Sequence, residues 1–308
     1  MSDPARTTPR TVLVIGATGS IGRLVVEEAA SAAYDVRALV RDSRRGRELP
    51  SGVQAVVGDL TRPETLSDAV RDVDAVVFTH GSNGSKADME AVDYGGVRNV
   101  LTALADHPAR VALMTLIGVT NRDSSYNRSA EGPDWKRRSE RLVRASGRPY
   151  TIVRPGWFDY NAPDENKPVL LQGDQRPSGD PSDGAVSRRQ IAQVLVASLA
   201  SAAADRKTFE LVAEHGQAPS NLDPMFAALD SDEPTSLDGA HDEDNMPLST
   251  EPARVRDDLE AIRMPAQPAD QPHKHCAKQR TRWTSTHREG TFVAEVDAYG
   301  ACAPYPSM

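Results

Sequence analysis

The chain has little of what marks a secreted or membrane-spanning protein. Its 308 residues include two cysteines, Cys276 and Cys302, both near the C-terminal end, so the sequence suggests neither a disulfide framework nor a catalytic thiol. No apolar run approaches the roughly 18 residues of a membrane span, and the first ten residues show no signal-peptide core. We therefore expect a cytoplasmic protein that does not contact a membrane.

The chain also lacks an excess of positive charge. The net charge is −8, and residues 216–263 account for it with 12 acidic residues against 3 arginines, whereas residues 1–215 carry no net charge. Proteins that bind nucleic acid need clustered lysine and arginine, so we expect no nucleic-acid partner. The acidic segment is instead a candidate surface for a protein partner, and the oligomeric state is open.

Short apolar runs alternate with helical patterns along the first two thirds of the chain. The expected strands cover residues 11–15, 35–40, 54–57, 75–78, 111–117, 150–153 and 208–212, and the expected helices cover residues 20–33, 63–70, 88–105, 133–145 and 187–200. Strands separated by helices of this length form βαβ units. The predicted fold class is α/β, a doubly wound parallel sheet of the Rossmann type with a small C-terminal extension.

This pattern divides the chain into four parts. We expect an N-terminal tail at 1–10, a dinucleotide-binding domain at 11–215, an acidic and partly helical extension at 216–263, and a disordered tail at 264–308. Within the extension, apolar residues recur at helical spacing, so it either packs over the site or forms a solvated linker with short helices. In the last part, His273, His275 and Cys276 lack a fourth ligand, and we expect no metal site.

Three glycines follow the first expected strand and precede the first expected helix. Glycines at this point let the backbone turn sharply and approach a pyrophosphate, which the helix N-terminus attracts. The arrangement of strand, glycines and helix predicts a dinucleotide site. The residues expected to hold the pyrophosphate are Gly16, Thr18, Gly19, Ser20, Ile21 and Gly22.

Several segments resemble the atypical short-chain dehydrogenases/reductases, including the flavin and biliverdin reductase type and the nitrogen-metabolite-repressor type. The resemblance extends over about residues 11–215. It implies the fold strongly and the reaction less strongly, because function resides in the site rather than in the fold. The segments that carry it are 16–22, 40–42, 58–60, 93–100, 136–140 and 150–156.

Cofactor choice depends on the end of the second expected strand. By the resemblance, Arg41 lies where the family contacts the 2′-phosphate of NADP(H), and an arginine neutralises that phosphate through a forked ion pair. We therefore favour NADP(H) over NAD(H). The alternative is that Arg41, Arg44 and Arg45 form an exposed basic turn and that Asp42 binds the ribose hydroxyl of NAD(H).

Further cofactor contacts follow from the same resemblance. Asp59 and Leu60 border the adenine, and Thr79, His80 and Gly81 follow the fourth strand at the edge where open α/β sheets bind ligands. His80 is either a proton donor or, as we favour, a histidine that packs beside the cofactor.

The expected catalytic pattern departs from that of the family. The family uses a tyrosine four residues before a lysine, with a serine on the preceding strand, so that the tyrosine protonates the nascent alkoxide. In this chain the lysine position is Lys136, the tyrosine position is Gly132, and the serine position falls near Thr115. A replacement for the acid is Tyr126, which we place in a loop over 121–131, either folded back or on the surface.

Aromatic residues make up 5% of the chain and gather after the sixth expected strand. There, Pro155, Gly156 and Trp157 are expected to border the cofactor, and Trp157, Phe158 and Tyr160 to bind the substrate. The alternative is that Trp157 and Phe158 pack in the core. Asp159 lies between them and would donate a proton only if its pKa were raised.

These residues predict an NADP(H)-dependent oxidoreductase that transfers a hydride to a small planar carbonyl, quinone or flavin-like substrate. One alternative is a non-catalytic NADP(H)-binding regulator that senses redox state, which the missing tyrosine favours. A second alternative is a sugar-nucleotide epimerase or dehydratase.

Overall fold

The computed structural model describes residues 10–82 and 84–263. The predictions for the N-terminal tail before Arg10 and for the tail over 264–308, with its cysteines and histidines, lie outside the described residues. The described part belongs to one compact unit that ends at Met264.

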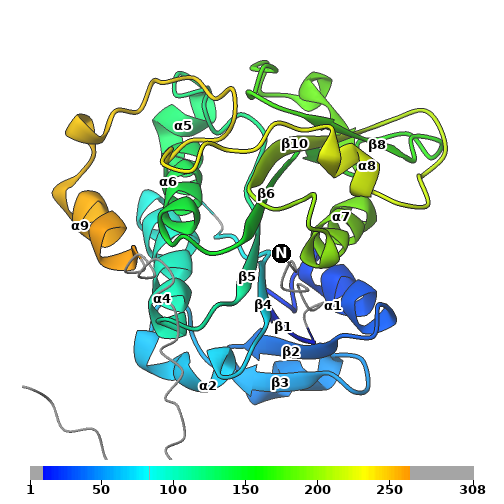
Figure 1. The fold of residues 1–308 in the computed structure, drawn as a ribbon, viewed down its shortest axis with the longest axis vertical. Coiled ribbons are helices and arrows are strands. Elements are labelled where there is room, and N and C mark those ends of the chain that lie inside the picture. Colours follow the sequence, from blue (N-terminus) through cyan, green and yellow to red (C-terminus); the bar gives the residue numbers. More distant parts are fainter. Residues whose placement is uncertain (1–9, 83, 264–308) are drawn as a thin grey trace, which may run out of the picture. The chain divides into compact units, whose positions relative to one another are not determined.

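A sheet of eight strands forms the centre of this unit (Figure 1). Its order is β3-β2-β1-β4-β5-β6-β10-β8, and all neighbours are parallel except β10 and β8. The predicted α/β fold class is therefore confirmed. The strands are β1 (Thr11–Ile15), β2 (Asp35–Val40), β3 (Gln54–Val57), β4 (Ala75–Phe78), β5 (Arg110–Met114), β6 (Tyr150–Pro155), β8 (Lys167–Leu171) and β10 (Lys207–Glu214).

Helices cover both faces of the sheet (Figure 1). One face carries α1 (Gly22–Ser31) and α7 (Arg188–Ala200), and the other carries α4 (Gly95–Leu104) and α6 (Gly132–Ala145). On the outer side of α4 and α6 lies α9 (Ala253–Ile262). The shorter helices are α2 (Ser67–Val70), α3 (Lys86–Asp88), α5 (Ser125–Ala130) and α8 (Asp223–Ala227).

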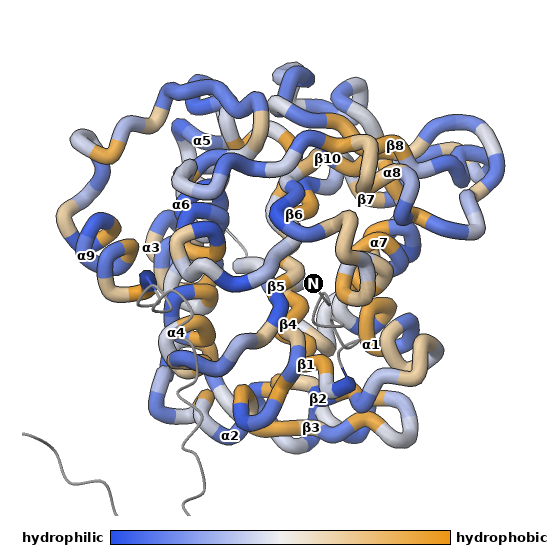
Figure 2. Tube along the Cα trace, viewed as in Figure 1, coloured by the Kyte–Doolittle hydropathy of each residue, from blue (hydrophilic) through white to orange (hydrophobic). Residues whose placement is uncertain are grey.

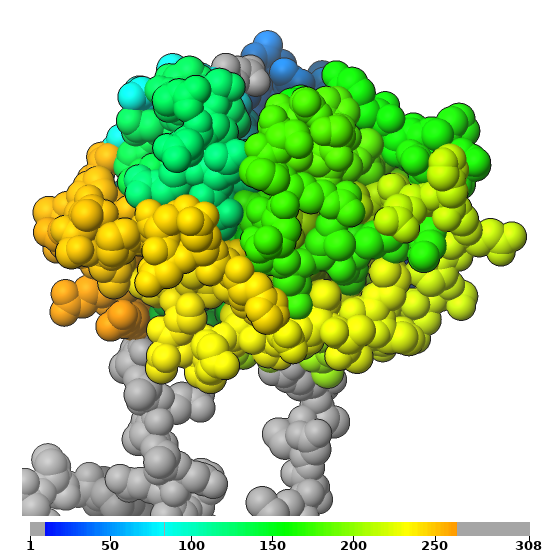
Figure 3. All heavy atoms as spheres, turned by 90° about the horizontal axis from the view of Figure 1, so that it is seen from above, coloured from blue at the N-terminus to red at the C-terminus, as the bar shows by residue number. Residues whose placement is uncertain are grey.

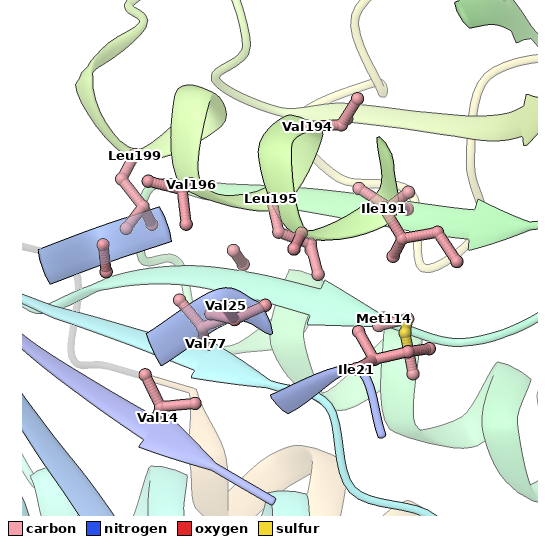
Figure 4. Packing of buried hydrophobic residues seen from close by; sticks show 14 of the residues in the cluster. Val14, Ile21, Val25, Val77, Met114, Ile191, Val194, Leu195, Val196 and Leu199 are labelled. Carbon is pink, nitrogen blue, oxygen red and sulfur yellow. The ribbon is translucent and has the colours of Figure 1, made fainter. Parts of the chain in front are cut away.

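Each face of the sheet has its own apolar core, because successive residues of a strand point to opposite faces. In β1, Val12 and Val14 join the cluster under α1 and α7, while Leu13 and Ile15 join the cluster under α4 and α6. The first cluster fills the space between β1, β4, α1 and α7 (Figure 4). Apolar residues accordingly dominate the central strands, and polar residues the surrounding loops (Figure 2).

Three strands were absent from the sequence prediction. The edge strand β8 pairs antiparallel with β10, and a short parallel pair joins β7 (Trp157–Phe158) to β9 (Ala185–Val186). All three are too short or too irregular in pattern for periodicity to reveal them. The long helix expected over 88–105 is instead divided into α3, a π-helical turn over Met89–Tyr94 and α4.

The acidic extension packs against the body of the unit. Phe226 of α8 joins the core under α1 and α7, and Val255 and Leu259 of α9 join the core on the other face. Between the two helices the chain crosses the surface of the molecule as a continuous band, drawn in yellow and orange (Figure 3). The extension is therefore not a solvated linker, but it does not pack over the site as the first alternative expected, because none of residues 216–263 lines the cavity at the carboxyl ends of β5 and β6.

Candidate dinucleotide and substrate site

The glycine loop joins β1 to α1 in a turn that only glycine permits. Gly16 has a φ of 82°, and a Cβ on it would lie 2.8 Å from the backbone nitrogen of His80. A Cβ on Gly22 would lie 2.0 Å from the carbonyl oxygen of Gly16. The backbone of Gly16 thus lies directly against the residues that follow β4, at the carboxyl edge where ligands bind in open α/β sheets.

The N-terminus of α1 is suited to an anion. Ile21 precedes the helix and offers no side-chain cap, so the first backbone N–H groups have no side-chain acceptor there. Gly19 and Ser20 are exposed beside these groups, and Thr18 is half-buried. The backbone nitrogens of Gly19 and Arg23 donate to carbonyls of the loop itself. The exposed backbone at this helix N-terminus and the helix dipole together favour phosphate, so the loop fits the pyrophosphate of a dinucleotide.

Arg41 and Asp42, the two residues after β2, differ in their contacts. Asp42 caps the turn over Ser43–Glu48 by accepting hydrogen bonds of 2.8 Å from the backbone nitrogen and from Nε of Arg44. These bonds occupy both oxygens of its carboxylate and hold the pKa of Asp42 below its usual range. The neighbouring Arg41 is exposed. The carboxylate of Asp42 is therefore already hydrogen-bonded to Arg44, whereas Arg41 faces solvent.

The residues expected near the adenine lie together at the carboxyl end of β3. The carboxylate of Asp59 accepts hydrogen bonds from the backbone nitrogen and hydroxyl of Thr61, which lower its pKa. Leu60 is half-buried, and its carbonyl accepts a hydrogen bond of 2.7 Å from Asn99.

The residues after β4 are built into the protein interior. Thr79 donates its hydroxyl hydrogen to the carbonyl of Ile15 at 2.8 Å, and Nε2 of His80 lies 3.0 Å from the carbonyl oxygen of Val92. Burial lowers the pKa of His80 to about 4, with a further contribution from the charge of Lys136. His80 is therefore neutral at pH 7 and buried at the carboxyl end of β4, and its expected packing beside the cofactor stays a prediction.

Lys136 projects from the first turns of α6 toward these residues. Its Nζ lies 2.6 Å from Oδ1 of Asp93 and 3.4 Å from the carbonyl oxygen of His80. A Cβ on Gly81 would lie within 3.9 Å of the same Nζ atom, so the ammonium group borders the backbone after β4. Although burial opposes it, the charge of Lys136 keeps the pKa of Asp93 below its usual value.

Tyr126 fills the space beside Gly132. The tyrosine lies on α5, not in a loop as expected, and a Cβ on Gly132 would lie 2.7 Å from its Cζ and hydroxyl oxygen. The ring is 44% exposed. Burial, followed by the charge of Asp93, raises the pKa of its phenol, so Tyr126 is protonated at neutral pH. The position of the missing family tyrosine is thus in contact with another tyrosine.

A cavity of about 350 Å³ opens at the carboxyl ends of β5 and β6. Mostly apolar groups line it, as is typical of sites for small molecules. Of the expected residues, the lining includes Tyr126, Pro155, Gly156, Trp157 and Phe158. Pro133 of α6 also contributes, so the cavity adjoins the helix that carries Lys136.

Two expected site residues lie elsewhere. The hydroxyl of Thr115 donates a 2.7 Å hydrogen bond to the buried carboxylate of Glu140, so it is directed into the interior, while the next residue, Leu116, lines the cavity. Tyr160 is 66% exposed and meets Trp157 edge-on with ring centroids 6.1 Å apart, outside the lining. Asp159 pairs with Arg188 and is exposed.

The lining also contains polar residues that the sequence did not single out. Asn121 and Ser124 precede α5, and Arg176 and Asp183 come from the segment between β8 and β9. Neither segment has a periodic pattern, and they approach the cavity only through the tertiary fold. Within residues 10–82 and 84–263 there is no group of three or more side chains that could hold a metal ion.

The fold and this site define a dinucleotide-binding α/β protein. A family model described as NAD(P)H-binding matches residues 16–202, more than half of the chain, so the chain belongs to this family. The predicted resemblance to atypical short-chain dehydrogenases/reductases is confirmed. Among the described residues, no helix is long and apolar enough to span a membrane. The expected cytoplasmic location stays a prediction.

Comparisons with individual proteins agree with this family. The chain is 30% identical over 207 residues to an uncharacterised sugar epimerase of Bacillus subtilis, covering 65% of this chain and 92% of the relative. It is 30% identical over 190 residues to an NAD(P)H azoreductase of Xenophilus azovorans, covering 61% and 63%. For one chloroplast relative the match spans 18% of that protein.

Among solved structures, a protein of Bacillus halodurans described as an NAD-dependent epimerase/dehydratase superposes with a TM-score of 0.60. The two chains are 23% identical, and the match covers 71% of this chain and all of the other. At this identity the likeness establishes the shared fold alone.

Proposed function

We propose that the protein is an NADP(H)-dependent reductase of a small, flat carbonyl, quinone or flavin-like compound. The observation that carries the proposal is the apolar cavity beside α6, which Tyr126 and Trp157 line. A flat acceptor held there lies next to the helix of Lys136 and to the edge of the sheet where the cofactor binds. That a relative is named an azoreductase supports reduction of a flat compound.

The residues present fit the cofactor. The uncapped N-terminus of α1 and the glycine loop would hold the pyrophosphate, and Lys136 the nicotinamide ribose. Because Asp42 is bound to Arg44 and Arg41 is exposed, the end of β2 suits a 2′-phosphate better than a ribose hydroxyl, which favours NADP(H). When bound, the reduced nicotinamide supplies the hydride.

Tyr126 supplies the proton in this proposal. A carbonyl oxygen that receives a hydride on its carbon becomes an alkoxide and takes one proton, which the protonated phenol of Tyr126 donates. The tyrosinate left behind recovers its proton from water, because the ring is 44% exposed. The ammonium group of Lys136 pairs with Asp93 at 2.6 Å, and the charge of Asp93 adds to the rise in the pKa of Tyr126, so the phenol keeps its proton until the acceptor takes it.

The direct test is NADPH oxidation in the presence of a panel of quinones, flavins and ketones. We expect acceptor-dependent oxidation by the wild-type protein and a rise in KM of about tenfold in Trp157→Ala, which removes the aromatic wall. The matched control is Leu248→Ala, an exposed apolar side chain outside the cavity, with KM unchanged. Absence of oxidation across the panel would overturn the proposal.

A second candidate is the redox-sensing regulator, which Gly132 at the tyrosine position favours. It requires that the two oxidation states of the cofactor change the affinity for a partner, because a ligand shifts only states that it binds differently. Pull-downs with NADP⁺ and with NADPH distinguish the candidates, and identical profiles would remove the regulator. The epimerase is less well supported, because a mostly apolar lining leaves sugar hydroxyls without partners.

A further inference from the structure

We infer that Arg176 makes the cavity selective for flat acceptors that carry a carboxylate or a sulfonate. The inference rests on the proposed function, because it names the class of compound that the reductase would accept.

Arg176 lies in the segment that connects β8 to the short turn over Pro181–Asp183. The residue is half-buried and lines both the main cavity and a smaller neighbouring cavity of about 140 Å³. The other side chains of the main lining are mostly apolar or uncharged. A guanidinium in such surroundings is partly removed from water, and its desolvation is offset only when an acceptor lies within reach.

The protein itself offers the guanidinium of Arg176 few hydrogen-bond acceptors. Nη1 of Arg176 donates one hydrogen bond of 3.2 Å, to the backbone carbonyl of Asp183. Across the described ranges 10–82 and 84–263, no carboxylate oxygen is recorded within ion-pair distance of this guanidinium. Because arginine carries five N–H donors, most of its capacity is left for a ligand.

The two carboxylates nearest in the linings have other partners. The oxygens of Asp183 accept hydrogen bonds of 2.8 and 2.6 Å from the backbone nitrogens of Ser178 and Gly179. Glu210, in the lining of the smaller cavity, accepts hydrogen bonds from Arg154 and from the backbone of Asp174. The hydrogen bonds of both carboxylates thus go to groups other than Arg176, and the remaining N–H donors of its guanidinium are left for a ligand.

A planar guanidinium matches a carboxylate or a sulfonate with two parallel hydrogen bonds, and such pairs fix orientation as well as affinity. Arg176 and Tyr126 both line the main cavity. An acceptor whose acidic group binds Arg176 has its ring against the apolar lining, and its reducible group is held in one orientation. Selectivity and orientation thus come from the same residue.

The test compares two quinones in one assay, 1,2-naphthoquinone and 1,2-naphthoquinone-4-sulfonate. In Arg176→Gln we expect kcat/KM for the sulfonate to fall by about 10-fold to 100-fold relative to the neutral quinone. The matched control is Arg128→Gln, an exposed arginine on α5 that also donates to a backbone carbonyl and lies outside the lining. Its ratio of the two quinones should stay at the wild-type value.

Equal losses for both quinones would assign Arg176 a structural role, and an unchanged ratio would show that it does not contact the acceptor; either result overturns the inference. A binding measurement separates this failure from failure of the proposed function. By calorimetry, naphthalene-2-sulfonate should bind the wild-type protein more tightly than the neutral naphthalene-2-sulfonamide, and Arg176→Gln should abolish the difference. If no acceptor is reduced, the reductase proposal fails, while calorimetry still decides the role of Arg176.

Discussion

Arginines occur in two contrasting regions of this protein. On α6 and β6, Arg137, Arg138, Arg141, Arg144 and Arg154 are buried, and each is paired with at least one carboxylate. In the cavity, Arg176 is half-buried and its recorded partner is a backbone carbonyl. The comparison shows that the buried arginines of α6 and β6 are paired with carboxylates, whereas the arginine of the candidate cavity has N–H donors left for the proposed ligand.

The acidic extension supplies most of the carboxylates in the first region. Asp232 pairs with Arg144, Asp238 with Arg137 and Arg141, Asp242 with Arg154, and Glu251 with Arg138. These acidic residues are consequently unavailable to a partner protein. The predicted partner surface would have to use the exposed acidic residues of the extension, and it stays a prediction.

The largest expected effect comes from breaking the buried pairs. Arg154 lies among Glu140, Glu210 and Asp242, so Arg154→Met leaves these carboxylates in the interior without their cation. We expect a loss of about 3 to 5 kcal/mol in the free energy of unfolding, measured by urea denaturation. As a control, Arg128→Gln on the surface should change it by less than about 0.5 kcal/mol. A loss that small in Arg154→Met would contradict a structural role for the pairs.

The next largest effect is expected on kcat, from substitutions at Tyr126 and Gly132. Tyr126→Phe should lower kcat by about 100-fold, the typical contribution of a general acid, with little change in cofactor affinity. Gly132→Ala places a methyl group where the ring of Tyr126 lies, so it should lower kcat by displacing the phenol.

The double variant provides the control for this pair of substitutions. If both act through the same hydroxyl, Tyr126→Phe with Gly132→Ala should lose no more activity than Tyr126→Phe alone. Full additivity of the two losses would show that Gly132 acts independently of the tyrosine.

A third effect depends on pH. Burial raises the pKa of Glu210 from 4.5 to about 7, with Asp174 and Asp242 adding to the shift against the opposing charge of Arg154. The folded state therefore binds this proton more tightly than the unfolded state, and stability from Glu210 is lost as pH rises from about 4.5 to about 7. Relative to wild type, Glu210→Gln should gain stability between pH 5 and pH 8.

Denaturation series at several pH values measure this difference directly. His80 contributes with the opposite sign, because its lowered pKa makes stability fall as pH drops from 6.5 toward about 4. The difference between Glu210→Gln and wild type cancels the histidine, which both proteins share. A difference that is constant with pH would show that Glu210 does not titrate in this range.

The smallest effect distinguishes the two cofactors. Arg41→Gln should raise the Kd for NADPH by about tenfold and leave the Kd for NADH unchanged, because it removes the partner of the 2′-phosphate alone. Arg44→Gln is the matched control, since Arg44 is occupied by Asp42. Tighter binding of NADH than of NADPH by the wild-type protein would reject the proposed preference.

Local patterns in the sequence were sufficient for the sheet and for the glycine loop. β2 and β4 have the bounds that were predicted, because buried parallel strands read as continuous apolar runs. The bounds of β3 were also predicted, although it is an exposed strand at the edge of the sheet. The glycines predicted the turn after β1, because a positive φ and contacts as close as that of Gly22 with Gly16 exclude other residues. The edge strand β8 was not predicted from the sequence, because its strand conformation depends on pairing with β10.

The sequence by itself thus determined the fold class, the dinucleotide loop and the absence of a tyrosine at Gly132. Only the tertiary structure decided that Tyr126 lies against Gly132, that Thr115 faces Glu140, and that the acidic extension covers α6. The reason is physical. A turn or a strand depends on residues near in sequence, whereas an ion pair or a cavity depends on segments that meet only after folding, such as Arg141 with Asp238, 97 residues apart.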